Sequence, residues 1–320
     1  MTQHRITPMT ESGLLAALTV VLAVLAVYLP VLGMAAALIW ALPILVLVVR
    51  HGIRWGIMAV LVSGVIMALL IEPLMSLRMV IAFAPTGLIL GLGFRKRWPG
   101  AKVFGTAFLA SLAGKLAALA LIFAVTAVNP LNLEVDTVRA SFDAVFHMYE
   151  DMGMNEAALA KSRQEIDEAM MLLQLLMPLI VLMMGLIDTA VGFLLGTRIL
   201  RRLGEAAEAL PPFAEWRLPS FFLYLFGFAL VGIYWGGTRD IQPLYQLSIN
   251  ANMVAIFAGL IQGLSLTHCV MRHYKLATAA RIIIIVLIIT SGFLTQLVAL
   301  TGLFDMIFDY RRRFAARGEK

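Results

Sequence analysis

The stretch GTAFLASLAGKLAALALIFAV, residues 105–125, decides the fold class of this chain, because it holds a single charged residue, Lys115, in an otherwise apolar run. A helix needs about 20 apolar residues to cross the hydrocarbon core of a bilayer. The stretch LIVLMMGLIDTAVGFLLG, residues 179–196, shows the same pattern with Asp188 as its single charge. Both stretches are therefore predicted to be membrane-spanning helices, each with one ionisable side chain deep inside it.

The charges of Lys115 and Asp188 are opposite, and the two residues lie at similar depth in consecutive predicted spans. An ionisable side chain near the bilayer centre costs at least ~2.5–3.5 kcal/mol on insertion scales, so it normally faces protein or water and has a partner. Two interpretations are open. The residues form a buried ion pair that fixes the packing of the two helices, or they line a polar cavity that binds an anionic or zwitterionic solute or relays protons.

Composition extends the membrane prediction to most of the chain. Of the 320 residues, 61% are hydrophobic and 14% are charged, and the mean hydropathy is +0.92. Soluble domains carry about 25% charged residues. The prediction is an all-α, polytopic membrane protein in contact with the lipid bilayer, with about ten transmembrane helices. The predicted spans are residues 13–30, 33–50, 55–72, 78–94, 103–128, 169–197, 220–236, 247–271, 275–291 and 293–310.

Basic residues determine the predicted orientation. The net charge of +6 comes from short Lys and Arg clusters between apolar runs, which indicates membrane orientation and no nucleic-acid partner. The clusters that follow spans two, four, six and eight are placed in the cytoplasm with the N-terminus. One long helix over 275–310 would put the last cluster, 311–313, outside, whereas a break at Ser291 and Gly292 keeps it cytoplasmic. Ten spans are therefore preferred, and nine are the alternative.

The sequence is expected to divide into three parts. Residues 1–202 hold six spans, and the first apolar run lacks a signal-peptide cleavage pattern, so it is expected to be retained. Residues 203–219 form a predicted cytoplasmic linker with the pair Pro211-Pro212, which breaks helices. Residues 220–320 form a C-terminal membrane unit with a basic cytoplasmic tail.

One segment, residues 129–168, differs from the membrane spans because nine acidic and three basic residues give it a charge of −6. On the predicted topology it faces outward. Val138, Phe142 and Val145 follow helical spacing, which predicts an amphipathic helix, and a second helix at 155–168 is predicted to run into span six. The segment is either a helical hairpin that covers the outer mouth of the six-span unit or a mobile lid over a site.

Two sets of polar residues are candidates for a functional site. Glu72 and Arg78 flank the predicted outer turn between spans three and four, as a surface pair or at the mouth of an outward-open cavity. Together with the two buried charges they form the hypothetical substrate-binding set Lys115, Asp188, Glu72 and Arg78. The second set lies in span eight, where interhelical hydrogen bonds or a polar lining account for it, and consists of Asn250, Asn252, Gln262 and His268.

Motifs for enzymatic chemistry are missing from the sequence. Gly114-Lys115 does not continue as a phosphate-binding loop, because Leu116 stands where Ser or Thr is required. The lone Cys269 supports neither a disulfide nor a thiolate metal site. We therefore expect no catalytic residue, no metal site and no cofactor, and we do not expect an enzyme.

Several short motifs after residue 205 resemble the YybS family, a bacterial family of multi-spanning membrane proteins with a domain of unknown function. They are LPPF at 210–213, WRLP at 216–219, QGLS at 262–265, GLFD at 302–305 and FDYR at 308–311. The resemblance implies a multi-pass protein of the bacterial cytoplasmic membrane, and it implies no settled activity.

The first six spans also resemble the substrate-binding S components of energy-coupling-factor (ECF) transporters. The cues are Ala16 and Ala17 in the first span, Pro43 in the second, and Arg50-His51-Gly52 at the following turn. S components bind a micronutrient from outside and dock an energising membrane subunit, so the resemblance implies a small-molecule solute and a membrane partner subunit.

The sequence thus favours a protein that binds a small solute or helps to transport it, with energy supplied by a partner. In this hypothesis the cavity lies among spans three to six, and Lys115 and Asp188 line or close it. The alternative is a non-transporting membrane scaffold or regulator that docks other membrane proteins through small-residue helix faces and its cytoplasmic linker.

Overall fold

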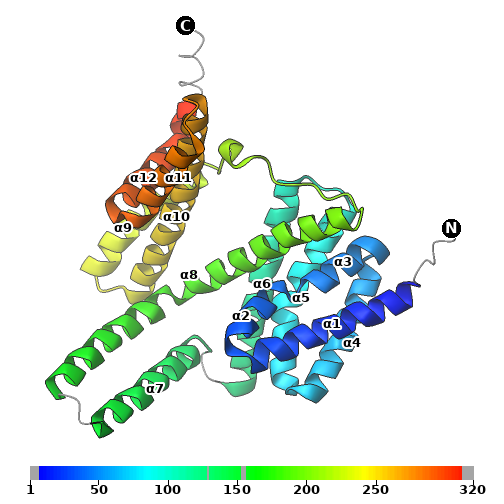
Figure 1. Cartoon of the computed structure of the whole chain (residues 1–320). Coiled ribbons are helices and arrows are strands. Elements are labelled where there is room, and N and C mark those ends of the chain that lie inside the picture. The colour runs from blue at the N-terminus through cyan, green and yellow to red at the C-terminus, as the bar shows by residue number, and fades with distance from the viewer. Residues whose placement is uncertain (1–6, 128–129, 153–155, 312–320) are drawn as a thin grey trace. The chain divides into compact units, whose positions relative to one another are not determined.

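The computed structural model describes residues 7–127, 130–152 and 156–311, and within these ranges the chain is all-helical, as predicted. The helices are α1 (Pro8–Tyr28), α2 (Pro30–Ile39), α3 (Leu42–His51), α4 (Ile53–Leu70), α5 (Pro73–Arg95), α6 (Gly100–Thr126), α7 (Pro130–Asp151), α8 (Glu156–Arg202), α9 (Phe221–Thr238), α10 (Gln242–His273), α11 (Thr278–Thr290) and α12 (Gly292–Phe308), with a short 3₁₀ turn, η1, at Phe213–Glu215 (Figure 1).

Eight helical segments among the described residues are long and apolar enough to cross a membrane. The pair α11 and α12 adds one more if it counts as a single broken span, and the two helices are bent by 101° at Ser291. The break at Ser291 and Gly292 lies where the sequence places it. By length and composition, the structure therefore contains eight or nine candidate spans. The sequence favoured ten spans, with nine as the alternative. The number of membrane crossings remains a prediction.

The second predicted span, 33–50, is not one continuous helix. It is interrupted at Trp40 and Ala41, between α2 and α3. Pro43 lies in the first turn of α3 and has no N–H, so it cannot donate to the carbonyl of Ile39 and continue the helix. Length and composition still allow Leu32–His51 to cross the membrane as one segment.

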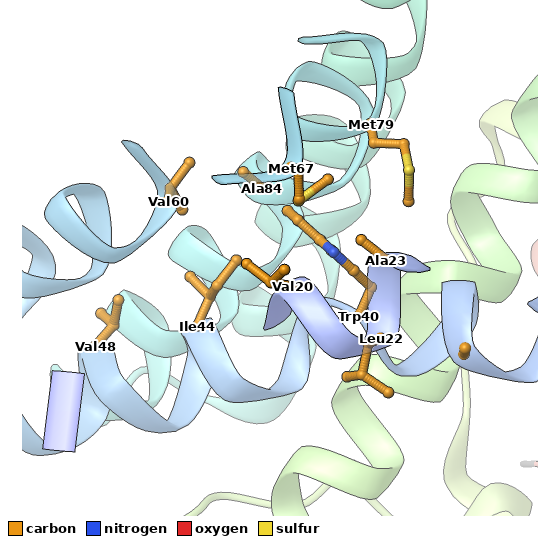
Figure 2. Packing of buried hydrophobic residues seen from close by; sticks show 11 residues of the cluster. Val20, Leu22, Ala23, Trp40, Ile44, Val48, Val60, Met67, Met79 and Ala84 are labelled. Atoms are coloured by element: carbon orange, nitrogen blue, oxygen red, sulfur yellow. The ribbon is translucent and has the colours of Figure 1, made fainter. Parts of the chain in front are cut away.

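The chain divides into two compact units, Met1–Leu210 (unit 1) and Pro211–Lys320 (unit 2), and the division falls inside the predicted linker. The core of unit 1 gathers around Trp40, whose ring is fully buried with Ala23, Met67 and Met79 (Figure 2). Helix α5 lies close to α3 because Gly91 has no side chain: a Cβ there would lie 2.6 Å from Cβ of Val48.

Helix α8 is 47 residues long, which corresponds to about 70 Å. This exceeds the ~30 Å hydrocarbon core of a bilayer, so only part of α8 can lie within the membrane. Its first half lies alongside α7 (Figure 1). Two ion pairs join the helices, Arg139 to Asp167 at 3.2 Å and Arg163 to Glu150 at 2.8 Å. The helix predicted at 155–168 and expected to run into span six is confirmed from Glu156 onward.

In unit 2, α10 packs against both α9 and α12. Small residues allow the close contact with α12: a Cβ on Gly259 would lie 2.5 Å from the carbonyl oxygen of Ala299, and a Cβ on Gly263 would also meet α12. The glycines spaced four apart in α10 are thus used within the chain.

Candidate functional site

Lys115 in α6 and Asp188 in α8 form an ion pair, with 3.1 Å between Nζ and Oδ2. Both side chains are buried, and Asp188 is only 2% exposed. The two charges are therefore paired within the protein, as the first interpretation of the sequence predicts.

Two hydroxyl groups complete the environment of Asp188. Thr86 in α5 donates to Oδ2 at 3.0 Å, and Ser111 in α6 donates to the same oxygen at 2.9 Å. Lys115 also donates to Oγ of Ser111 at 2.9 Å, which is one helical turn earlier in α6. One carboxylate oxygen thus joins α5, α6 and α8, while Oδ1 of Asp188 has no hydrogen-bond partner among the described residues.

The close approach of α5 and α6 at this point depends on Gly114. A Cβ on Gly114 would lie 2.6 Å from the carbonyl oxygen of Ile81, so a larger residue would push the helices apart. The absence of a side chain at Gly114 therefore allows α5 and α6 to pack closely enough for Thr86 and Ser111 to reach Asp188.

Lys115 also faces a cavity of about 280 Å³ in unit 1. Its Nζ lies 4.9 Å from the ring centre of Phe83, within the range of a cation–π interaction. Five helices contribute to the cavity wall, namely α1, α2, α5, α6 and α8. The lining residues are Ala26, Val27, Ala37, Met75, Arg78, Met79, Ala82, Phe83, Lys115, Ala118, Leu119, Val181 and Met184.

The structure brings together part of the predicted binding set. Lys115 and Arg78 line the cavity, and they are the charged members of its lining. Asp188 pairs with Lys115 but is not one of the residues that line the cavity. Glu72 is exposed at the N-terminal end of α5 and is outside the lining. The pair and the cavity, treated as alternatives from the sequence, are therefore neighbouring features that share Lys115.

The acidic segment 129–168 contributes no residue to the cavity lining. Its described part forms α7 and the start of α8, with Phe146 buried and with Val138, Phe142 and Val145 more than a third exposed. Its role as a cover or a lid remains a prediction.

Among the residues that suggested an S component, Arg50 and His51 lie in the last turn of α3, and Ala16 and Ala17 lie in the middle of α1. Arg50 and His51 both bind the carboxylate of Glu11, and Nε2 of His51 lies 2.7 Å from it. Ala16 is buried, whereas Ala17 is exposed. Glu11 was not singled out from the sequence, and the likeness to S components remains a prediction.

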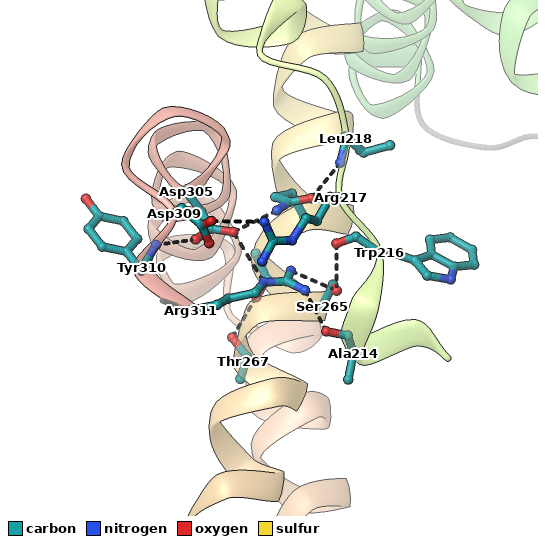
Figure 3. A network of polar contacts seen from close by, with 12 residues as sticks. Ala214, Trp216, Arg217, Leu218, Ser265, Thr267, Asp305, Asp309, Tyr310 and Arg311 are labelled. Atoms are coloured by element: carbon teal, nitrogen blue, oxygen red, sulfur yellow. Dashed lines mark hydrogen bonds and ion pairs between the residues drawn. The ribbon is translucent and has the colours of Figure 1, made fainter. Parts of the chain in front are cut away.

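Unit 2 contains a second buried polar network (Figure 3). Gln262 in α10 donates to Oδ2 of Asp305 at 2.7 Å and accepts from the backbone N–H of Leu218 at 3.0 Å. Arg311 lies 3.5 Å from Oδ2 of Asp305 and donates to Ser265 at 3.0 Å. The network ties the segment before α9 to α10 and to the end of α12, and it is built from the short motifs noted after residue 205.

The remaining polar residues of α10 do not gather into one site. Asn250 donates to the carbonyl of Gln246 at 2.7 Å, and Oδ1 of Asn252 is buried with no hydrogen-bond partner among the described residues. His268 lies 6.3 Å from Phe213 between ring centres. Within the described ranges there is no group of three or more His, Cys, Asp or Glu residues that could hold a metal ion.

Comparison with known proteins agrees with the membrane character of this fold. A family model described as "Predicted membrane protein (DUF2232)" matches residues 17–306. The chain is also similar to a protein of Bacillus subtilis (strain 168) described as "Uncharacterized protein YybS". The two are 24% identical over 307 residues, which is 95% of this chain and 97% of that protein, and the predicted resemblance to the YybS family is confirmed. No solved structure matches the chain.

Proposed function

This chain belongs to the DUF2232 family of predicted membrane proteins, and we propose that it binds a small solute with an anionic group in the cavity of unit 1. The protein then helps the solute to cross the bacterial cytoplasmic membrane, with energy supplied by a partner and without an enzymatic reaction. The observation that carries the proposal is the placement of Lys115 and Arg78, the two charged residues of the cavity lining.

The position of Lys115 suits ligand binding because its side chain is already held in place. Asp188 and Ser111 accept hydrogen bonds from Nζ, and Phe83 lies against the ammonium group. A ligand that meets a fixed group loses less free energy in ordering it than a ligand that meets a mobile one. Charged residues inside membrane segments commonly mark solute pathways.

The cavity lies toward the ends of the helices that the positive-inside rule places outside. Met75 and Arg78 belong to the first turns of α5, and Ala26 and Val27 belong to the last turns of α1. The basic clusters lie at the opposite ends of these spans. We therefore propose that both chain termini are cytoplasmic and that the solute enters from outside.

A partner would supply energy, since the sequence has no phosphate-binding loop. On α1, Gly13 and Ala17 lie one helical turn apart, Ala17 is exposed, and a Cβ on Gly13 would meet nothing within 4 Å. Small residues allow another helix to approach closely. This face of α1 is the proposed contact with a membrane partner.

The competing proposal is a non-transporting scaffold that docks partners through small-residue faces. The structure leaves fewer such faces free, because Gly91 contacts α3 and Gly114 contacts α5, while Gly259 contacts α12. The solute cavity therefore has more support in the structure than a scaffold role.

The proposal is tested by measuring the melting temperature of the purified full-length chain with a panel of micronutrients and small organic anions. A true ligand raises the melting temperature of the wild type, because it binds the folded state, and has no effect on Lys115→Met. Lys102→Met is the matched control, since it makes the same change at an exposed position of α6. A panel in which no solute stabilises the wild type would rule against solute binding.

A further inference from the structure

The hydrogen bonds of Lys115 leave room for one more acceptor. A lysine ammonium group has three N–H donors, and two oxygens of the described residues accept from it, Oδ2 of Asp188 and Oγ of Ser111. Because Lys115 also lines the cavity, an oxygen of a ligand can become the third acceptor while the ion pair with Asp188 stays intact.

Asp188 limits how much negative charge the ligand can bring. Its carboxylate lies 3.1 Å from Nζ and offsets the positive charge of Lys115. Like charges repel strongly where the dielectric constant is low. Arg78 is the other cation of the lining, so Lys115, Asp188 and Arg78 together carry a net charge of +1. A ligand with one negative charge balances these three groups, whereas a second negative charge would be left uncompensated near Asp188.

The rest of the cavity excludes most polar solutes. Apart from Lys115 and Arg78, the lining side chains are those of Ala, Val, Leu, Met and Phe. Hydroxyl or amide groups of a sugar, a nucleoside or a peptide that lie against these side chains find no hydrogen-bond partner on them, and burial without a partner opposes binding. The body of the ligand is therefore apolar.

The volume of the cavity and its lining side chains indicate how large the apolar part of the ligand can be. The cavity volume of about 280 Å³ lies near the lower end of the ~300–1,000 Å³ that is typical of small-molecule sites. Phe83 offers a ring face, and Met75, Met79 and Met184 are unbranched side chains that adapt to different shapes.

From these observations we infer that the solute is a small monocarboxylate, with one carboxylate group at Lys115 and an apolar or aromatic body against Phe83 and the methionines. The inference rests on the proposed function, because it names the chemical class of the solute that the cavity of unit 1 binds.

Isothermal titration calorimetry on the purified full-length chain tests the chemical class of the ligand. Three probes carry a phenyl group, namely 4-phenylbutyrate, its amide, and phenylsuccinate as a dicarboxylate. Oleate is added as a membrane-derived carboxylate. The inference expects 4-phenylbutyrate to bind at least tenfold more tightly than the amide and than phenylsuccinate. An amide or a dicarboxylate that binds as tightly as 4-phenylbutyrate would overturn it.

A variant that fills the cavity locates the binding without changing a charge. Ala118→Leu places a larger side chain in the lining, and Ala117→Leu makes the same change at the adjacent, exposed position. We expect at least a tenfold loss of 4-phenylbutyrate affinity in Ala118→Leu and an unchanged affinity in Ala117→Leu. Equal affinity in both variants would show that the carboxylate binds elsewhere. This pair keeps the test decisive even if Lys115→Met fails to fold.

The outcomes separate the inference from the proposed function. A polar micronutrient that stabilises the wild type but not Lys115→Met, while 4-phenylbutyrate does not bind, would overturn the monocarboxylate class and leave solute binding in place. Binding of oleate without 4-phenylbutyrate would also overturn the class and would indicate a lipid. Failure of every probe and every solute would overturn both.

Discussion

Gln262 in α10 and Asp305 in α12 are joined by a hydrogen bond of 2.7 Å between two buried side chains. The same carboxylate lies 3.5 Å from the guanidinium group of Arg311 and accepts from the backbone N–H of Tyr310 at 2.9 Å. Asp305 therefore holds α10, α12 and the residues that follow α12 in one arrangement.

Replacing Asp305 with alanine is expected to destabilise unit 2 strongly. The change leaves Arg311 as a buried charge without its carboxylate, and breaking a buried pair in this way costs about 3–5 kcal/mol. The melting temperature of the purified chain measures the effect. Arg217→Met is the control, because its pair with Asp309 at 2.9 Å is more than half exposed on the arginine side and is expected to contribute about 0.2–1 kcal/mol. Equal shifts in the two variants would contradict this role of Asp305.

A second prediction concerns the coupling of Lys115 and Asp188. Lys115→Met and Asp188→Ala each leave one buried charge without its partner, so each is expected to lose about 3–5 kcal/mol of stability. The double variant removes both charges and is expected to be more stable than either single variant. Thermal unfolding of the four proteins gives the coupling energy. Additive losses would show that the 3.1 Å pair does not act as a unit.

The long apolar helices and the two buried charges could be recognised in the sequence for clear physical reasons, although the pairing of the charges was one of two interpretations. Long apolar runs predict spans because a bilayer requires about 20 apolar residues per helix. Lys115 and Asp188 were identifiable because a charge in such a run needs a partner. The family motifs after residue 205 were recognisable in the sequence, and the structure adds that Gln262, Ser265 and Asp305 meet in one network.

The polar contacts and the cavity were harder to predict. Thr86 and Ser111 are ordinary residues of apolar spans, and nothing in their spacing identifies them as partners of Asp188, although Ser111 lies one turn from Lys115. Pro43 is visible in the sequence, yet the interruption at Trp40 and Ala41 appears only in the structure. A cavity is a gap in three-dimensional packing, which hydrophobic patterns do not describe.

A third prediction tests the close contact of α3 and α5 with a pair of glycine substitutions. Gly91→Ala would place a Cβ 2.6 Å from Val48 and 2.9 Å from the carbonyl oxygen of Leu45, and such overpacking costs about 1–3 kcal/mol. At Gly105 a Cβ would meet nothing within 4 Å. Gly105→Ala is expected to stabilise α6 by up to about 1 kcal/mol, because alanine favours helices. If Gly91→Ala were more stable to heat than Gly105→Ala, the close contact of α3 and α5 at Gly91 would be contradicted.

The last prediction concerns the path of α11 and α12. Arg311, just after α12, contacts the carbonyl oxygen of Ala214, which precedes α9. The end of α12 therefore lies beside the start of α9, and a single broken span would separate them by the width of the membrane. Helix α11 has 13 residues and α12 has 17 residues, so they are about 20 and 26 Å long. Each helix is therefore shorter than the ~30 Å hydrocarbon core of a bilayer. We expect the pair to enter the membrane and return to the cytoplasmic side.

Single-cysteine labelling tests this path, because Cys269 is the one cysteine of the sequence and is replaced by alanine in the background protein. In intact cells, a membrane-impermeant maleimide is expected to label Thr238→Cys, at the predicted outer end of α9, and to leave Ser291→Cys and Gly318→Cys unlabelled. Permeabilised cells should then show labelling of Gly318→Cys. Labelling of Ser291→Cys from outside would instead establish two full crossings and ten spans. Labelling of Gly318→Cys from outside would establish one broken span, and either result would contradict a hairpin that returns within the membrane.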